Sequence, residues 1–323
     1  MTDAQESRTH EARSAARRRT FLLSLAILLG LGGVAGLNRW LEVNRPPTDP
    51  ALEEEKLYVT GAAARRMSLG FNGLIADWYW MRSLQYVGRK VIKMQEEHPY
   101  STVVLEDFGP LKLKLLYPLL DTTTTLDPQF LPAYEYGALV LPVVSRTDND
   151  EDAIALLKKG IAANPNAWKL YHYLGYIHWQ RKEYELASEA YSAGARLPGA
   201  PKWMEAMVAQ MKFQGNDPET ARAIYERMYE QADDPQVKNM VKVRLWQIDS
   251  VKEREVIRRI LSEHQQRTGQ CASSWQEVAR GLQTTGLNVD ESGAPLDPAG
   301  TPYRLVKNGC DVDLNPGSKV PYK

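Results

Sequence analysis

Histidine and cysteine are the residue types in this sequence best suited to chemistry. The five histidines are widely separated, and none has an HExxH or other metal-ligand spacing: His10, His98, His172, His178 and His264. The sequence contains neither a Cys-x-x-Cys-His haem motif nor a GxxxxGK[ST] phosphate loop. The glycines at 30–36 lie in an apolar run rather than after a strand, and Ser273-Ser274 lacks the flanking glycines of a nucleophile elbow. The sequence therefore predicts no catalytic residue, metal site or cofactor, and no enzyme activity.

The two cysteines, Cys271 and Cys310, bracket a short, loop-rich C-terminal segment. An isolated pair in that setting is a disulfide candidate, and a disulfide requires an oxidising compartment. Closing a loop of about 40 residues stabilises a fold by roughly 4 kcal/mol in the chain-entropy treatment. Two free thiols and a metal site are the alternatives, although no histidine-rich partner supports the metal site.

An apolar run near the N-terminus is the sequence's membrane signal. Residues Phe21 to Leu37 carry no charge, Trp40 follows them, and Arg17, Arg18 and Arg19 precede them. The run is at the short end of the length that spans a bilayer. Positive residues stay on the cytoplasmic side, so we expect a cytoplasmic tail (1–19), a transmembrane helix (20–40) and a Pro- and Glu-rich spacer (41–64). The rest would then lie in the periplasm, anchored by one inner-membrane span.

Two other interpretations of the apolar run remain open. It could be a cleaved signal peptide, because Gly33-Val34-Ala35 is a small-x-small site and Arg18-Arg19-Thr20-Phe21-Leu22 resembles a twin-arginine export motif. It could also be a buried helix of a soluble protein. If it is an anchor, Gly32 and Gly36 have the small-xxx-small spacing that allows two such helices to pack as a homodimer.

A period of 34 residues runs through the middle of the chain. Three alanines lie in register: Ala153, Ala187 and Ala221. A large residue follows each by four positions: Leu157, Tyr191 and Tyr225. Prolines come at the expected end of each unit: Pro165, then Pro198 and Pro201, then Pro235. A small residue allows two antiparallel helices to approach, a large residue fills the neighbouring gap, and proline ends the pair.

This pattern resembles the tetratricopeptide repeat (TPR) family. The best unit, residues 168–201, matches the family pattern at Leu174, Gly175, Tyr184, Ala187 and Tyr191. It departs at His178, where an aromatic residue is usual, and at Gly194, where alanine is usual. Residues 202–235 and 130–165 match less well, and 65–235 has room for about four units. The resemblance implies a mostly α fold, with a solenoid of helix pairs over 65–266.

The TPR resemblance also implies a binding surface. In this family the first helix of each unit lines a concave groove that binds peptides or partner domains. Transferred to this sequence, the groove residues are Lys169, His172, Tyr176, Trp179, Trp203, Gln210 and Phe213. Tyrosine and tryptophan are common among the residues that dominate binding energy. The structural alternative is that about half of these side chains pack beneath a neighbouring helix.

Beyond the repeats, residues 236–266 read as one long helix, and 267–323 as a small α+β module. The module resembles a piece of pseudopilins, through Thr268-Gly269, Leu282, Gly286 and the run from Asp297 to Tyr303. That resemblance implies a short helix at 275–287 and a hairpin. Some relatives bind calcium near this turn, which would involve Asp297, Asp311 and Asp313 here. Solvated loop acids are the expected alternative.

Taken together, these features predict a membrane-anchored scaffold. With 40 basic and 40 acidic residues the net charge is zero, which gives no reason to expect a nucleic-acid partner. We expect the partners to be envelope proteins or peptides, with membrane lipid around residues 20–40. Assembly or quality control in secretion, pilus or translocon-associated systems would use such a scaffold. The alternatives are a structural subunit held by its C-terminal module, and a membrane adaptor facing the cytoplasm.

Overall fold

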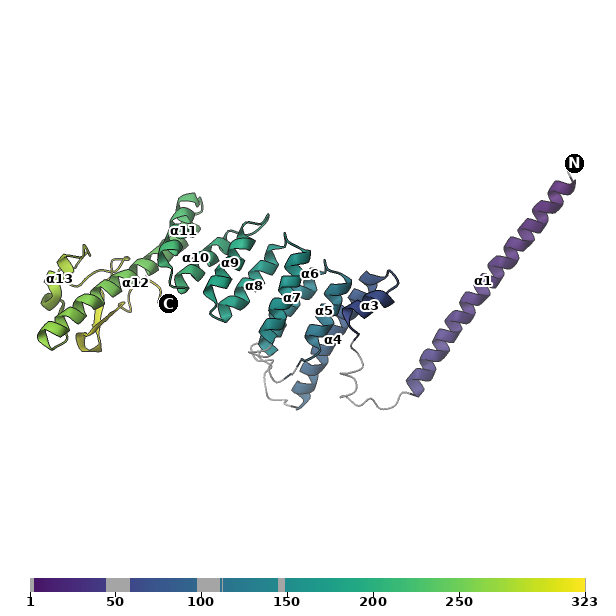
Figure 1. The fold of residues 1–323 in the computed structure, drawn as a ribbon, viewed down its shortest axis with the longest axis horizontal. Coiled ribbons are helices and arrows are strands. Elements are labelled where there is room, and N and C mark those ends of the chain that lie inside the picture. The colour runs from purple at the N-terminus through teal and green to yellow at the C-terminus, as the bar shows by residue number, and fades with distance from the viewer. Residues whose placement is uncertain (1–2, 45–58, 98–110, 112, 145–148, 323) are drawn as a thin grey trace. The chain divides into compact units, whose positions relative to one another are not determined.

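The chain is mostly helical and divides into two units, Met1–Tyr58 and Val59–Lys323 (Figure 1). The structure is a computed structural model that describes residues 3–44, 59–97, 111, 113–144 and 149–322. Most of the predicted spacer (41–64) therefore lies outside the described residues. The solenoid of helix pairs and the small C-terminal sheet that the sequence predicts are both present.

The first unit contains one long helix, α1 (Asp3–Val43). Its segment Phe21–Val43 has a mean hydropathy of 2.0, and it is long and apolar enough to cross a membrane. Side chains from residue 21 to residue 44 are all exposed within the chain. A signal sequence has the same length and composition, so the helix by itself indicates only that a span is feasible.

Helix pairs form the middle of the second unit. The first helices are α6 (Leu131–Val144), α8 (Trp168–Gln180) and α10 (Trp203–Gln214). Their partners are α7 (Asn149–Ala163), α9 (Tyr184–Ala195) and α11 (Pro218–Gln231). Each helix packs on the one before and the one after it, as Figure 1 shows from α6 to α11. The turns within the pairs are tight: Lys182 and Asn216 have positive φ, and Asp217 caps α11 just before Pro218.

The 34-residue period marks the core of these pairs. The three alanines in register are fully buried, and so are the large residues four positions later. The structure also explains why Gly194 replaces the usual alanine. A Cβ at Gly194 would lie 2.5 Å from Cε of Met204 and 2.8 Å from Cβ of Tyr171, closer than carbon atoms pack. The larger methionine on α10 fills the space that an alanine methyl group would occupy.

Among the described residues of the second unit, three α-helices precede the pairs: α3 (Gly61–Met67), α4 (Asn72–Glu97) and α5 (Leu116–Leu126). α4 is rich in aromatic residues, and most of its aromatic side chains pack inward. Tyr79 is buried, and Trp80 lies against the rings of Phe130 and Tyr136 at centroid distances of 5.7 and 5.4 Å. Trp78 is the exception at 49% exposed.

α12 (Pro235–Thr268) connects the helix pairs to the C-terminal module. Its first half packs against α11, whereas Ile257 and Leu261 belong to the module's own core, together with Val312. The module also contains the strands β1 (Arg304–Val306) and β2 (Asp311–Asp313), joined by the turn η3 (Lys307–Gly309). The strands pair antiparallel with Leu305 opposite Val312, which confirms the predicted hairpin. The resemblance to pseudopilins stays a prediction.

The helix predicted at 275–287 is shorter in the structure, so the predicted extent is wrong. The structure has a 3-10 turn, η2 (Trp275–Val278), followed by the single helical turn α13 (Ala279–Gln283). The hydroxyl groups of Thr284 and Thr285 donate to the carbonyl oxygens of Gly281 (2.8 Å) and Leu282 (2.6 Å). These bonds compete with helical continuation, and Gly286 then turns the chain at φ 74°.

Candidate functional site

Consecutive first helices lie side by side and bring most of the predicted groove residues together. The ring of Trp203 on α10 meets His172 of α8 at 4.9 Å and Trp168 at 6.2 Å, both edge-on. Farther along, Trp179 Nε1 donates a 2.8 Å hydrogen bond to Oε1 of Gln214 on α10. We use the term aromatic face for the surface formed by Trp168, His172, Tyr176, Trp179 and Trp203.

Two rings of the aromatic face are open to solvent. Tyr176 is 38% exposed and Trp203 is 42% exposed, whereas His172 and Trp179 are half-buried. Tyr176 packs edge-on against Trp179 at 5.8 Å, and its hydroxyl accepts a 2.7 Å hydrogen bond from Gln180 Nε2. The exposed rings are thus held by their neighbours and would lose little freedom on contact with a partner.

The other predicted groove residues lie apart from the aromatic face. Lys169 forms a 3.6 Å ion pair with Glu135 of α6. Phe213 is half-buried against the core formed by α10, α11 and α12, and Gln210 Oε1 lies 3.5 Å from the hydroxyl of Tyr225. Gln210 and Phe213 follow Tyr176 and Trp179 of α8 by 34 residues, but their surroundings are less aromatic. Their role in binding stays a prediction.

Two polar atoms below the aromatic face have no hydrogen-bond partner among the described residues: Nδ1 of His172 and the hydroxyl of Tyr191. The two rings are 5.9 Å apart, and the ring of Tyr191 packs against Gly175. Burial lowers the pKa of His172, so its ring is neutral at pH 7, and burial raises the pKa of Tyr191. Buried polar atoms without partners are rare, and here they lie directly behind the proposed contact surface.

Sequence reasoning missed Trp168 and Gln214. The signal for Trp168 was present, because Trp168, His172 and Tyr176 follow one another at four-residue intervals and therefore share one stripe of a helix. Gln214 carried no such signal. Its contact with Trp179 depends on how α10 packs beside α8, which the residue types do not reveal.

The C-terminal module holds Cys271 and Cys310 at disulfide distance, with their Cα atoms 4.9 Å apart. The adjoining residues explain the close approach. Gly309 has φ 88°, and a Cβ there would lie 1.8 Å from the carbonyl oxygen of Ala272. Only glycine allows the two cysteine-bearing segments to pass this closely.

The three aspartates considered for an ion site are not solvated loop acids. Asp297 is buried, and its Oδ1 accepts 2.9 Å hydrogen bonds from the backbone N–H groups of Ala299 and Thr301. The carboxylate of Asp311 pairs with Lys307 and Arg258, which hold its pKa below the usual range. Asp313 pairs with Arg254 and Arg304. Their oxygens are committed to hydrogen bonds and ion pairs, and the described residues contain no group of three side chains placed to hold a metal ion.

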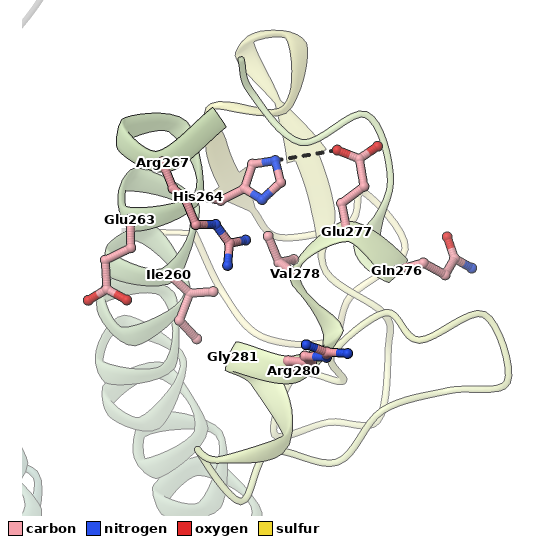
Figure 2. A pocket seen from close by; sticks show the side chains of 9 residues that line it. All are labelled: Ile260, Glu263, His264, Arg267, Gln276, Glu277, Val278, Arg280 and Gly281. Carbon is pink, nitrogen blue, oxygen red and sulfur yellow. Dashed lines mark ion pairs between the residues drawn. The ribbon is translucent and has the colours of Figure 1, made fainter. Parts of the chain in front are cut away.

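A pocket of about 450 Å³ lies between α12 and the η2–α13 segment (Figure 2). It is lined by Ile260, Glu263, His264, Arg267, Gln276, Glu277, Val278, Arg280 and Gly281. Sequence reasoning did not find it, because His264 stands alone in the sequence and its neighbours across the pocket come from a different segment. The close packing depends on Gly281, where a Cβ would lie 2.8 Å from Cγ2 of Ile260.

Comparisons with known proteins add little to this description. No protein-family profile and no curated protein matches the chain. Among solved structures, it is similar to TTC0263, a thermophilic TPR protein of Thermus thermophilus (17% identity, TM-score 0.32, 56% of this chain and 97% of that one). It is also similar to MamA protein (17% identity, TM-score 0.29, 48% of this chain and 87% of that one). The TPR-like fold therefore rests on the helix pairs themselves, and function must be argued from the chain's own surfaces.

Proposed function

We propose that this protein is a membrane-anchored, non-catalytic scaffold whose aromatic face binds partner polypeptides. The observation that carries the proposal is the pair of exposed rings, Tyr176, which packs against Trp179 within α8, and Trp203 of α10, which packs against His172 of α8. Helical repeats of this kind present extended surfaces suited to protein–protein interaction. Assembly or quality control of envelope proteins, in secretion, pilus or translocon-associated systems, is the role that fits an anchored scaffold.

The chemistry of the aromatic face favours a polypeptide over a small molecule. Large, rigid rings bury much apolar area at low entropic cost, and tyrosine and tryptophan dominate many protein interfaces. The side-chain amide of Gln180 lies beside the rings, where it can pair with a peptide backbone. The neutral ring of His172 would leave the centre of the surface uncharged.

The membrane and the side of the membrane are also part of the proposal. Phe21–Val43 supports a single span, and the arginines before it support a cytoplasmic N-terminus. The pairing of Cys271 with Cys310 supports an oxidising compartment for the C-terminal module. Alkylation of the full chain in intact cells tests on which side of the membrane the C-terminal module lies. We expect the two thiols to react only after reduction; reaction without reductant would favour the adaptor that faces the cytoplasm.

Replacing both exposed rings tests the binding surface. We expect Tyr176→Ala with Trp203→Ala to reduce crosslinked partner in native membranes about tenfold or more, because such rings are typical hot spots. Tyr229→Ala is the matched control, since Tyr229 is 40% exposed but lies on α11, a second helix of its pair. Unchanged capture by a double variant that retains the wild-type melting temperature would refute binding through the aromatic face.

A structural subunit held by its C-terminal module is the second candidate. The pocket between α12 and the η2–α13 segment favours it, because Arg267 and Arg280 line that pocket and have no ion-pair partner among the described residues. Purification from membranes separates the two candidates. A partner that remains bound in fixed proportion after the Tyr176→Ala and Trp203→Ala changes indicates a structural subunit, whereas loss of the partner indicates a scaffold.

A further inference from the structure

The pocket between α12 and the η2–α13 segment has two cationic groups that no acid among the described residues neutralises. Arg267 near the end of α12 and Arg280 on α13 are exposed, and neither has an ion-pair partner within the part of the chain that the structure describes. Three other arginines of α12 and the module form ion pairs, Arg254, Arg258 and Arg304, with Arg258 pairing with Asp311 at 2.8 Å. Arg259 also lacks an ion-pair partner among the described residues, but it does not line the pocket. Arg267 and Arg280 are thus two unpaired guanidinium groups that line one pocket.

His264 adds a buried polar atom to the same pocket. Its ring is only 8% exposed, and Nε2 lies 3.4 Å from Oε2 of Glu277. Nδ1 has no hydrogen-bond partner among the described residues. In Figure 2 this second nitrogen points into the space between α12 and η2, toward Val278, with Arg280 farther along the same space. A buried ring nitrogen without a partner leaves hydrogen-bonding capacity that a ligand can satisfy.

The walls between these polar groups are apolar. Ile260 and Val278 line the pocket from opposite elements, and Gly281 contributes no side chain. Glu263 also lines it, but Figure 2 shows its carboxylate extending away from the space between α12 and η2. The site thus combines a buried nitrogen and two guanidinium groups with room for an apolar side chain, and its volume of about 450 Å³ exceeds what a single ion fills.

We propose that this pocket binds a carboxylate of a partner polypeptide. Guanidinium groups match carboxylates by forming two parallel hydrogen bonds. Nε2 of His264 faces the Glu277 carboxylate and carries the ring proton, so Nδ1 is an acceptor, placed to accept a hydrogen bond from the backbone N–H of the residue that bears the carboxylate. The apolar walls would hold the side chain next to that carboxylate. Of the two glutamates that line the pocket, Glu277 is bonded to Ser273 and His264 and Glu263 extends away, so the two guanidinium groups are the charges left to meet an anion.

A peptide carboxylate has two sources, the C-terminus of a chain and an Asp or Glu side chain. Short synthetic peptides distinguish them. One pair has a C-terminal valine as the free acid or as the amide, and a second, with both ends blocked, has glutamate or glutamine at its centre. Binding to the full chain in nanodiscs is measured by titration calorimetry. We expect at least one acid to bind about tenfold or more tightly than its uncharged counterpart, because charged hydrogen bonds are the strong ones.

Variants that remove the charges of the two arginines test whether these residues bind the carboxylate. We expect Arg267→Gln with Arg280→Gln to abolish the preference for the acid form, with no change in melting temperature, since both side chains are exposed and unpaired. Arg259→Gln is the matched control, because Arg259 is exposed on the same helix and does not line the pocket. The NMR signal of the His264 ring nitrogens should shift on addition of the preferred acid peptide.

Three results would overturn the proposal. The first is equal affinity for the acid and uncharged peptides in both pairs. The second is an equal loss of affinity in Arg259→Gln, which would indicate a general charge effect. The third is tighter binding of inorganic phosphate than of the preferred peptide. None of these depends on the aromatic face, so the proposed function and this inference can fail separately.

Discussion

At the scale of single residues, Glu253 is a carboxylic acid whose surroundings oppose its ionisation. It lies on α12, and its Oε2 accepts a 2.8 Å hydrogen bond from the hydroxyl of Tyr303 in the C-terminal module. Burial raises its pKa to about 7. Because the contact joins the long helix to the module, its protonation state affects how firmly the two are held.

The raised pKa of Glu253 makes stability depend on pH. The folded chain holds the proton up to about pH 7, whereas the unfolded chain loses it near pH 4.5. The free energy that protonated Glu253 contributes to folding is therefore fully present below pH 4.5, and it is lost as the pH rises to about 7. We expect Glu253→Gln, which cannot ionise, to raise the melting temperature more at pH 8 than at pH 5. Calorimetry of the full chain at both pH values measures this, and an equal effect at both would contradict it.

The candidate site shows how far residue types alone can predict function. Tyr176 and Trp203 were found from the repeat register, because position within a helix pair sets which side a residue faces. The pocket of His264, Arg267 and Arg280 was not found, since its two sides are separated in sequence and meet only by tertiary packing. The acids near the C-terminal hairpin were misjudged for the same reason: Asp311 pairs with Arg258, 53 residues away.

At the scale of elements, one close contact secures the best-matched helix pair. A Cβ at Gly175 of α8 would lie 2.8 Å from ring carbons of Tyr191 on α9, and Tyr191 is fully buried and cannot withdraw. We expect Gly175→Ala to destabilise the protein by about 1–2 kcal/mol, because overpacking outweighs the higher helix propensity of alanine. Chemical denaturation followed by circular dichroism measures the change.

Gly88 in the middle of α4 is the matched control. Apart from its chain neighbours and the backbone of its own helix, no atom of the described residues lies within 4 Å of its added Cβ, so Gly88→Ala changes helix propensity without a clash among them. We expect it to stabilise by roughly 0.5–1 kcal/mol. If both substitutions shifted stability in the same direction, the close approach of α8 and α9 would not be a determinant of the fold.

Most elements were predictable, and the exceptions have local causes. α12 was expected at 236–266 and forms at Pro235–Thr268, because Asp234 and Pro235 begin it and Gly269, in the left-handed conformation, ends it. The helix expected at 275–287 stops at Gln283 because threonine hydroxyl groups bond to its carbonyl oxygens. Helix caps can be recognised from residue types in the sequence. Side-chain hydrogen bonds that compete with the helix are seen only in the folded structure.

At the scale of the whole molecule, the chain combines a feasible membrane span, a TPR-like solenoid and a C-terminal module with paired cysteines. α12 is shared by the solenoid and the module, since Val241 packs with the helix pairs and Leu261 packs with the module. One continuous helix therefore joins the core of the helix pairs to the core of the module. The solenoid and the module were predicted from the sequence, but the helix that they share is seen only in the structure.

The central claim is that the aromatic face contacts a partner polypeptide. The most direct test places a photoreactive phenylalanine analogue at Tyr176 in the full chain and irradiates native membranes. The same analogue at Glu189, exposed on the second helix of that pair, is the control. The account predicts a discrete crosslinked partner from position 176 that is absent from position 189 and is lost when Trp203→Ala is added. Equal crosslinking at both positions, or none at 176, would contradict it.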